Sequence, residues 1–309
     1  MTAALPWFDA DRVMSTGFAA ATDALESALG SGFDPAGDAS RISVPLAHGE
    51  FLLMPSEASR VAGVKVLTVA PANPERDLPR IQAVYLLCDS ETLTPQALLD
   101  GTALTTLRTP ALSALAARHL APSEPGRLLV VGSGPQAWSH VHALAAVCDL
   151  AEVVITGRSA ARADQLAERL RDEGFDARAG EAADVADATI VVCATTASEP
   201  VLDRARIADD ALVIAVGSHE PGRRELDGAL VGRSQVVVED TATALREAGD
   251  VIMAIDEGHA DAARLVPLAR IVRGEASVDR SRPRVFKSVG MGWEDLVVAA
   301  ACAGMAGSG

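Results

Sequence analysis

One segment of this 309-residue chain constrains its fold more than any other, the glycine-rich stretch Gly132-Ser133-Gly134-Pro135-Gln136-Ala137. It follows the apolar run 128–131, which predicts a buried strand, and it leads into residues 140–146, which read as a helix. A strand, a tight glycine turn and a helix form the context in which G-x-G-x-x-A binds a dinucleotide. The alternative is a glycine turn in an unrelated α/β fold.

The small residues of this motif have separate physical roles. Gly132 lets the chain turn, Gly134 lets backbone approach a pyrophosphate with no side chain between, and Ala137 keeps the helix close to the strand. The phosphates then meet free N–H groups at the positive end of the helix. We therefore predict that all six residues of the motif contact the cofactor.

Length and charge limit the partners of the chain. At 309 residues it is near the limit for one hydrophobic core, so two domains are expected. A formal net charge of -15 disfavours nucleic acid or an anionic membrane as a partner, although a local cluster of cations could still bind a small anionic substrate. Aromatic residues make up only 3% of the chain, which argues against platforms for stacking bases.

The cysteines indicate neither a zinc site nor a disulfide framework. They are scattered, lie mostly in apolar runs and form no C-x-x-C or Cys/His pair: Cys88, Cys148, Cys193 and Cys302. Buried free thiols in a reducing cytosol are the simplest interpretation, and no metal is expected. The first nine residues do not resemble a signal peptide, and no apolar run reaches membrane-spanning length. We expect a cytoplasmic protein.

The N-terminal part of the chain changes character twice. Apolar positions at helical spacing predict a helix over residues 9–30. Three β-type runs follow at 51–54, 64–69 and 83–87, and the turns between them predict an antiparallel or mixed sheet. A second helical pattern covers residues 102–120, where Pro110 either starts the regular helix, with Thr109 as N-cap, or kinks it.

Strands and helices alternate after a Pro-rich linker at 122–126, which predicts a parallel, doubly wound sheet. The predicted strands are 128–131, 153–156, 188–193, 211–216 and 236–239, with helices at 160–171 and 293–304.

The end of the second of these strands bears on the choice of cofactor. A site that prefers NAD usually carries an acidic residue there, which binds the ribose hydroxyls. This chain has Arg158 and Ser159 instead, a cation and a hydroxyl that suit the extra phosphate of NADP. We predict that NADP(H) is preferred over NAD(H). The alternative is a surface arginine in a site that accepts either cofactor.

Residues that close the next two strands are candidates to line the nicotinamide and its ribose, because the carboxyl ends of such strands face the cofactor crevice. They are Thr195, Thr196, Val216, Gly217 and Ser218. Alternatively, the two threonines simply cap the next element.

Three cations precede the nucleotide domain, Arg41, Lys65 and Arg108. Lys65 is the most informative, because a lysine within an apolar strand must reach water or find a counter-ion. A cleft-facing lysine that meets a substrate carboxylate satisfies that demand. Taken singly, each cation could equally be an ordinary surface residue.

From about residue 10 to 304 the chain resembles the ornithine cyclodeaminase/μ-crystallin family. The resemblance rests on the glycine turn together with Arg41, Leu53-Met54-Pro55, Gly63-Val64-Lys65, Pro71-Ala72-Asn73, Leu99-Asp100-Gly101, residues 104–109 and Phe286-Lys287-Ser288-Val289-Gly290. It implies a homodimer of two-domain subunits. Residues 122–290 would form a Rossmann domain, and residues 1–121 with 291–309 an α+β domain that binds substrate and dimerises. In such a subunit Arg41, Lys65 and Arg108 fall where the family binds the substrate carboxylate, and Lys65 is also close to the reacting carbon.

Departures from the cyclodeaminases narrow the choice within the family. Those enzymes carry an acid just before Leu-Met-Pro and a catalytic aspartate two residues after the glycine that ends the fourth strand; here the positions hold Leu52 and His219. A diamine would find no partner for its distal ammonium, whereas Leu52 and Met54 suit an apolar ring. The resemblance is therefore strongest to the pyrroline/piperideine-2-carboxylate (ketimine) reductases, oxidoreductases of proline metabolism.

The expected reaction is hydride transfer from NADPH to C2 of a cyclic imine, giving L-proline or L-pipecolate. His219 is a candidate proton donor because it follows a strand end and titrates near neutrality, although a solvated loop histidine is the alternative. Asp295 matches a recurrent family acid and either touches substrate or caps the last helix. Competing expectations are an ornithine cyclodeaminase, an alanine or opine-type dehydrogenase, and a non-catalytic binding protein.

Overall fold

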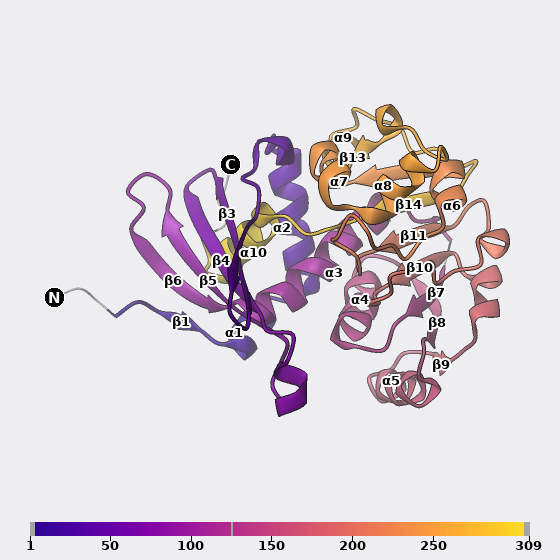
Figure 1. Ribbon diagram of the computed structural model, residues 1–309, viewed down its shortest axis with the longest axis horizontal. Helices are drawn as coiled ribbons and strands as arrows, with labels where there is room; N and C mark the ends of the chain where they lie inside the picture. The colour runs from indigo at the N-terminus through magenta and orange to yellow at the C-terminus, as the bar shows by residue number, and fades with distance from the viewer. Residues whose placement is uncertain (1–3, 125, 306–309) are drawn as a thin grey trace. The chain divides into compact units, whose positions relative to one another are not determined.

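The structure, a computed structural model, describes residues 4–124 and 126–305, and the chain divides into two compact units (Figure 1). The first comprises Met1–Thr109 and Met291–Gly309, and the second comprises Pro110–Gly290. The division lies between Thr109 and Pro110, inside the continuous helix α3 (Gly101–Leu120), whereas the predicted boundary follows residue 121. The two halves of this helix belong to different units. Pro125, in the predicted linker, lies outside the described residues.

A six-stranded sheet dominates the first unit, in the order β1-β6-β5-β4-β3-β2. Its strands are β1 (Trp7–Phe8), β2 (Ile42–Leu46), β3 (Gly49–Ala58), β4 (Val61–Val69), β5 (Ile81–Asp89) and β6 (Pro95–Asp100). The pair β1/β6 is parallel and the others are antiparallel, so the prediction of a mixed sheet is confirmed.

The helices of the first unit include α1 (Ala10–Met14), α2 (Phe18–Gly30) and α10 (Gly292–Cys302), with short 3₁₀ turns at Pro35–Gly37 and Asn73–Arg76. The single helix predicted over residues 9–30 is wrong. Gly17 interrupts it with φ 77°, a conformation that ends α-helical hydrogen bonding and favours glycine. The C-terminal α10 packs on α2 and on β3 and β4, and so helices cover one face of the sheet (Figure 1).

One register row runs across the covered face of the sheet. Lys65 pairs with Met54 on one side and Tyr85 on the other, and the row continues through Leu99 to Phe8. Directly paired residues point to the same face, and every member of this row is at most 4% exposed. Lys65 is therefore buried by the alternation of its strand, which puts it under the helices.

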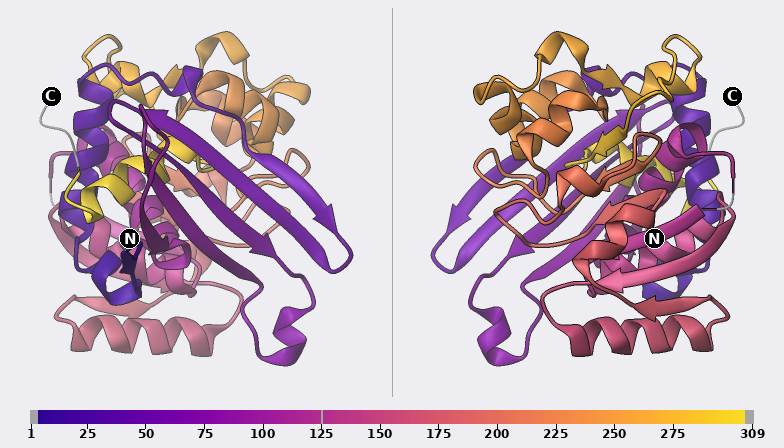
Figure 2. Two further views of the ribbon diagram at one scale, coloured as in Figure 1. Left: turned by 90° about the vertical axis from the view of Figure 1, so that its left-hand side faces the viewer. Right: turned by 90° about the vertical axis from the view of Figure 1, so that its right-hand side faces the viewer.

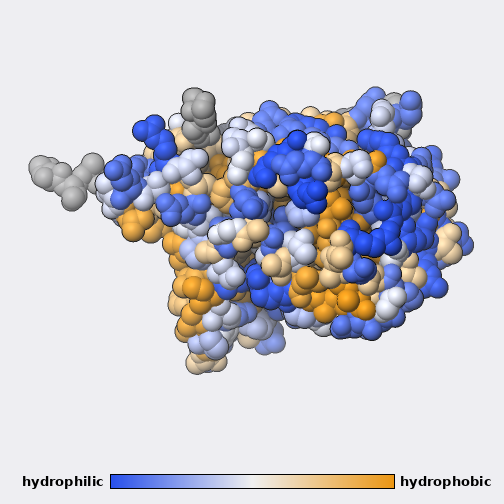
Figure 3. All heavy atoms as spheres, turned by 90° about the horizontal axis from the view of Figure 1, so that it is seen from above, coloured by the Kyte–Doolittle hydropathy of each residue, from blue (hydrophilic) through white to orange (hydrophobic). Residues whose placement is uncertain are grey.

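The opposite face of the sheet is apolar but exposed. Val44 pairs with Phe51, and Ile42 pairs with Leu53 on the same face. Ile42, Val44 and Phe51 are 51%, 40% and 37% exposed. Figure 2 (left) shows the strands of this face without a helix across them, and Figure 3 shows apolar residues gathered along this side of the unit.

The second unit contains an eight-stranded parallel sheet in the order β13-β12-β14-β11-β10-β7-β8-β9. Its strands are β7 (Gly126–Val131), β8 (Leu150–Thr156), β9 (Ala177–Ala179), β10 (Ile190–Cys193), β11 (Leu212–Ala215), β12 (Gln235–Val238), β13 (Val266–Pro267) and β14 (Arg284–Lys287). The doubly wound fold and all five predicted strands are confirmed. The sequence reading missed β9, β13 and β14, which are short or carry charged residues at both ends.

The remaining helices are α3 (Gly101–Leu120), α4 (Pro135–Ala145), α5 (Ala160–Asp172), α6 (Gly228–Arg233), α7 (Thr241–Glu247), α8 (Gly249–Asp256) and α9 (Leu268–Val272), with 3₁₀ turns at Ala182–Asp187, Arg204–Arg206 and Ala262–Arg264. Among the described residues, no helix combines the length and apolarity needed to cross a membrane.

The start of α3 corrects one prediction. Asp100 Oδ1 accepts hydrogen bonds from the backbone N–H groups of Thr102 and Ala103, both at 2.9 Å, so the helix begins before them. Pro110 lies inside α3, and the interpretation of Thr109 as an N-cap is wrong.

The cysteines are free thiols, as predicted, but they differ in burial. Cys193 is buried within β10, whereas Cys88, Cys148 and Cys302 are only half-buried. The prediction of buried thiols is therefore confirmed for Cys193 alone.

Candidate active site

The chain contains only two lysines, Lys65 and Lys287, and each is 1% exposed. One lies in each unit, and each forms an ion pair with a buried carboxylate. Burying an unpaired ammonium is very costly, so a buried lysine marks a cluster of charges that the fold holds together. We call these the Lys65 cluster (Lys65, Arg108, Glu294 and Asp295) and the Lys287 cluster (Lys287, Asp250 and Glu225).

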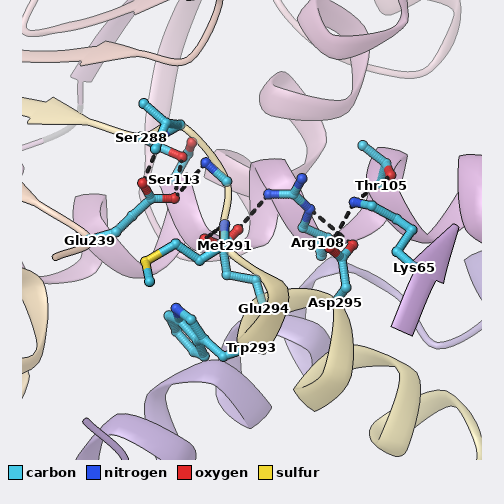
Figure 4. Close-up of polar contacts among 12 residues, drawn as sticks. Lys65, Thr105, Arg108, Ser113, Glu239, Ser288, Met291, Trp293, Glu294 and Asp295 are labelled. Atoms are coloured by element: carbon cyan, nitrogen blue, oxygen red, sulfur yellow. Dashed lines mark hydrogen bonds and ion pairs between the residues drawn. The ribbon is translucent and has the colours of Figure 1, made fainter. Parts of the chain in front are cut away.

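Three elements of the first unit assemble the Lys65 cluster: β4, the first half of α3, and α10 (Figure 4). Lys65 Nζ lies 2.7 Å from Asp295 Oδ2 and donates a longer bond, 3.3 Å, to Thr105 Oγ1. Arg108 Nη1 lies 2.5 Å from Glu294 Oε2, and its Nε lies 3.2 Å from Asp295 Oδ1. Asp295 therefore bridges the two cations.

The first turn of α10 explains why Asp295 is available for this role. Glu294 Oε1 accepts the N–H of Met291 at 2.8 Å, and Asp38 Oδ2 accepts the N–H of Trp293 at 2.9 Å. These two carboxylates satisfy amides that have no partner within the helix. Glu294 and Asp38 accept these amides, while Asp295 contacts Lys65 and Arg108, so contact of Asp295 with substrate stays a prediction.

Burial dominates the electrostatics of this cluster. It lowers the pKa of Lys65 to about 8, a shift that the carboxylate of Asp295 only partly offsets. Burial also raises the pKa of Asp38 and of Tyr85. The four members of the cluster carry two positive and two negative charges when ionised. Such an arrangement complements a ligand that itself carries both signs.

The structure brings together the side chains of Lys65, Arg108 and Asp295, and the strand register locates the backbone of Arg41. Arg41 precedes Ile42, which pairs with Leu53, the neighbour of Met54, and Met54 pairs with Lys65. This register puts the backbone of Arg41 two strand spacings, about 10 Å, from that of Lys65. Two of the three predicted cations thus meet at one carboxylate, and the participation of Arg41 stays a prediction. Leu52 and Met54 alternate onto the same face as Lys65.

The glycine turn of the second unit has the predicted geometry. Gly132 has φ 133°, and a Cβ there would lie 2.6 Å from the carbonyl oxygen of Ala194. A Cβ on Gly134 would meet nothing within 4 Å, and Gly134 caps α4 without a side-chain hydrogen bond. The start of α4 is therefore open to a ligand. The residues present fit a pyrophosphate, with Ser133, Pro135, Gln136 and Ala137 completing the turn and first helical residues.

Arg158 and Ser159 lie where the sequence predicts them, directly after β8. Both residues are exposed. Ser159 is the N-cap of α5, its Oγ accepting the N–H of Arg162 at 3.4 Å, so part of its hydrogen-bonding capacity is used locally. Arg158 remains the cation of this strand end.

The predicted nicotinamide-lining residues lie at the ends of β10 and β11, and a buried carboxylate holds two of them. Glu225 Oε1 accepts from the N and Oγ1 of Thr195, and Glu225 Oε2 accepts from the N of Gly217. Thr195 Oγ1 also accepts the N–H of Ala197 at 3.1 Å, but Ala197 lies in a loop and begins no helix, so this hydrogen bond is a local turn. Thr196, Val216 and Ser218 adjoin these positions.

The histidines differ in their surroundings. His219 is an exposed residue of the loop after β11 and stays a predicted proton donor. His140 is buried, its ring nitrogens lie 2.7 Å from the carbonyl oxygen of Gln136 and 3.0 Å from Ser113 Oγ, and burial lowers its pKa to about 4. His140 is thus a neutral structural residue.

Sequence reasoning assigned no role to several charged residues: Asp38, Glu225, Asp250, Lys287 and Glu294. Lys287 carried the same signal as Lys65, because it follows the apolar pair Val285-Phe286. Asp250 likewise precedes the apolar pair Val251-Ile252. Glu225 and Asp38 lie in polar segments, where nothing in the sequence distinguishes them from surface acids.

Comparison with known proteins gives concordant results. Residues 11–306 match the profile of the Ornithine cyclodeaminase/mu-crystallin family. A Delta(1)-pyrroline-2-carboxylate reductase of Bacillus cereus is 35% identical over 272 residues, 84% of this chain and 83% of the relative. The Delta(1)-pyrroline-2-carboxylate/Delta(1)-piperideine-2-carboxylate reductase of Azospirillum brasilense is 37% identical over 266 residues, 85% and 82% of the two chains.

Among solved structures, that of the Thermococcus litoralis Delta(1)-pyrroline-2-carboxylate reductase in complex with NADH and L-proline is similar to this fold. The two superpose with a TM-score of 0.90 at 27% sequence identity, over 98% of this chain and 97% of the other.

Proposed function

Because the chain belongs to the ornithine cyclodeaminase/mu-crystallin family, we propose that it is an oxidoreductase that reduces a cyclic ketimine to an amino acid with a nicotinamide cofactor. The substrate is Δ1-pyrroline-2-carboxylate, Δ1-piperideine-2-carboxylate or both, and the product L-proline or L-pipecolate. The first unit binds the substrate and the second binds the cofactor. The observation that carries this proposal is the buried Lys65 cluster, in a chain whose relatives are named as reductases of these imines.

The charges of the cluster match those of the substrate. A protonated ketimine acid carries a carboxylate and an iminium, so its net charge is zero. Lys65 and Arg108 attract the carboxylate, with Arg41 as a further cation, while Asp295 stabilises the iminium. Two unit charges 4 Å apart interact by about 4 kcal/mol at an effective dielectric of about 20, and desolvation offsets much of this. The cluster therefore acts mainly by orienting the ring.

When bound, the reduced nicotinamide would supply the hydride that C2 receives, and the proton that converts the imine to the iminium stays on the ring nitrogen of the product amine. Lys65 is suited to hold and release that proton, because its pKa of about 8 lies close to neutral pH. Asp295 fixes the Lys65 ammonium by its 2.7 Å hydrogen bond. His219 is the second candidate donor. Leu52 and Met54 supply an apolar surface and no counter-ion for a second amine.

A substrate screen tests this proposal. Oxidation of NADPH is followed with pyrroline-2-carboxylate, with piperideine-2-carboxylate, and with pyruvate plus ammonia. We expect turnover of at least one ring without added ammonia. Release of ammonia from L-ornithine with catalytic NAD would assign a cyclodeaminase instead. Turnover of pyruvate only when ammonia is present would assign an alanine-type dehydrogenase, and no turnover of either ring would end the proposal.

We propose further that NADP(H) is preferred over NAD(H), on the basis of Arg158 and the absence of an acid at residues 157–159. Arg158→Ala should lower kcat/KM for NADPH by about 10- to 100-fold, the usual size of a lost charge-assisted contact, and leave that for NADH within about twofold. Arg162→Ala, in the first turn of α5, is the matched control. Equal loss with both cofactors, or none, would contradict the preference.

A homodimer is the proposed assembly. The exposed apolar face contains Ile42 and Val44 of β2 and Phe51 of β3, and β2 is an edge strand of the sheet. A second copy of the chain would cover this face and the unpaired edge of β2. Light scattering coupled to size exclusion should give twice the subunit mass, 31.9 kDa. Phe51→Glu should shift the protein to monomers, and a wild-type monomer would refute the assembly.

A further inference from the structure

The Lys287 cluster lies entirely within the second unit and is as well buried as the Lys65 cluster. Glu225, in the loop before α6, is 0% exposed, and Asp250 and Lys287 are each 1% exposed. Lys287 Nζ lies 2.9 Å from Asp250 Oδ2, and it also donates to the carbonyl oxygen of Ser218 at 2.6 Å. None of these side chains reaches the surface, so they act on a ligand only through the chain that they hold.

Glu225 holds the ends of two adjacent strands with one carboxylate. Its Oε1 accepts from the N and Oγ1 of Thr195 at 2.8 and 2.7 Å, and its Oε2 accepts from the N of Gly217 at 2.7 Å. A Cβ on Gly217 would lie 2.5 Å from Glu225 Oε1 and 2.1 Å from the carbonyl oxygen of Thr195. The ends of β10 and β11 therefore fit closely around this carboxylate.

Asp250 in turn fixes the backbone of Glu225. Its Oδ1 accepts the N–H groups of Glu225 and Leu226 at 2.7 and 2.8 Å, while its Oδ2 faces Lys287 at the end of β14. The cluster thus ties together the carboxyl ends of three strands, β10, β11 and β14. In a doubly wound sheet this edge borders the crevice in which a dinucleotide binds.

We propose that Glu225 is a positioning residue for the nicotinamide half of the cofactor, acting through the backbone of Thr195 and Gly217. This inference rests on the proposed function, because it requires a dinucleotide in the second unit. In this arrangement the glycine turn binds the pyrophosphate and adenosine half of the cofactor. Glu225 determines the shape of the backbone around the nicotinamide half.

The ionised state of Glu225 is part of this role. Three donors face its two oxygens, an arrangement that a carboxylate satisfies and a carboxamide does not, because the amide group would point an N–H at one of them. Burial raises the pKa of Glu225 to about 6, with Lys287 acting in the opposite direction, so the group is ionised at pH 7.5.

Binding measurements at pH 7.5 test the proposal without relying on turnover. The probes are NADPH and 2′,5′-ADP, which carries the phosphorylated adenosine half but no nicotinamide, and NADH and ADP as the corresponding pair. Glu225→Gln should raise the Kd for NADPH by about tenfold, as expected when a charged hydrogen-bond acceptor is lost, and leave the Kd for 2′,5′-ADP within about twofold. Thr195→Val, which removes only the hydroxyl donor, should give a smaller effect of the same kind.

Glu247→Gln is the matched control, because Glu247 is a buried glutamate of the same unit on α7. It should leave both dissociation constants unchanged. Equal weakening of whole cofactor and fragment by Glu225→Gln would show a merely structural role and overturn the inference, as would no change in either. If Glu225→Gln does not fold, Thr195→Val decides by the same criterion. A wild-type protein that binds NADPH but reduces no imine would refute only the proposed function, and one that binds no dinucleotide would refute both.

Discussion

The two lysines of this chain lie in similarly buried clusters that are built in different ways. Around Lys65 the carboxylates of Asp295 and Glu294 meet the side chains of Lys65 and Arg108, and Glu294 also accepts a backbone N–H, that of Met291. Around Lys287 the carboxylates of Asp250 and Glu225 accept four backbone N–H groups, from Glu225, Leu226, Thr195 and Gly217. A carboxylate bound to backbone fixes the chain, whereas side-chain ion pairs can exchange partners with an entering ligand. Burial and charge alone do not distinguish a reactive cluster from a supporting one.

The largest difference is expected between the two lysine substitutions. Lys65→Met should lower kcat/KM for the ketimine by about 10³-fold, because both the orienting cation and a proton donor are lost, while the Kd for NADPH stays within about threefold. Lys287→Met should instead weaken NADPH and destabilise the fold by about 3–5 kcal/mol, because Asp250 loses its buried cation. Steady-state kinetics, cofactor titration and denaturant unfolding check both. If the two variants changed kcat/KM, the Kd for NADPH and stability in the same way, the proposed difference between the two clusters would be wrong.

The carboxylates give a second, smaller contrast. Asp295→Asn should lower kcat/KM by about 10²-fold and destabilise the fold less than Asp250→Asn, because Arg108 retains Glu294 and Lys65, whose pKa is already about 8, can become neutral when its carboxylate is lost. Asp250→Asn should mainly destabilise the fold, since Asp250 anchors two backbone amides and Lys287. Activity per folded molecule, with the folded fraction from circular dichroism, separates these effects. An Asp250→Asn protein that keeps its stability but loses turnover would reverse the assignment.

The smallest effect expected is a titration of Lys65. With ¹³C label at Cε, the two lysines give two resonances, and Lys65→Met identifies one of them. The signal of Lys65 should titrate at about pH 8, and kcat/KM should fall as pH rises through that value, because the uncharged amine neither attracts the carboxylate nor donates a proton. A midpoint near the ordinary 10.5 would contradict the burial argument.

The same shift has a defined effect on stability. The folded-state pKa of Lys65 lies below the ordinary value of 10.5, so the unfolded chain binds the proton more strongly between about pH 8 and 10.5. Stability from this group is full above the unfolded pKa and is lost as pH falls through about 8. The free energy of unfolding of the wild type should therefore rise relative to that of Lys65→Met as pH increases from about 8 to 10.5.

Local signals predicted much of the fold. The apolar runs of the parallel sheet, the glycine turn and the helix over 160–171 all have a periodicity or a turn chemistry that is readable within a few residues. The helix break at Gly17 and the strand β14 were missed. The sequence does not show whether a glycine within an apolar helical pattern has a positive φ angle, as Gly17 has. The strand β14 has charged residues, Arg284 and Lys287, at its two ends, so it does not read as an apolar run although all four of its residues are buried.

What the sequence alone determined was the need for a partner: a lysine in an apolar strand requires a counter-ion wherever it lies. Only the tertiary structure decided which residue that is. Lys65 and Asp295 are 230 positions apart, and they meet because α10 returns to pack on β3 and β4. Glu225 gains its role in the same way, from the strand ends that close around it. The cost of desolvation falls on a single residue and can be inferred from its apolar neighbours in the sequence. Ion pairing depends on distances between residues that only the folded chain defines.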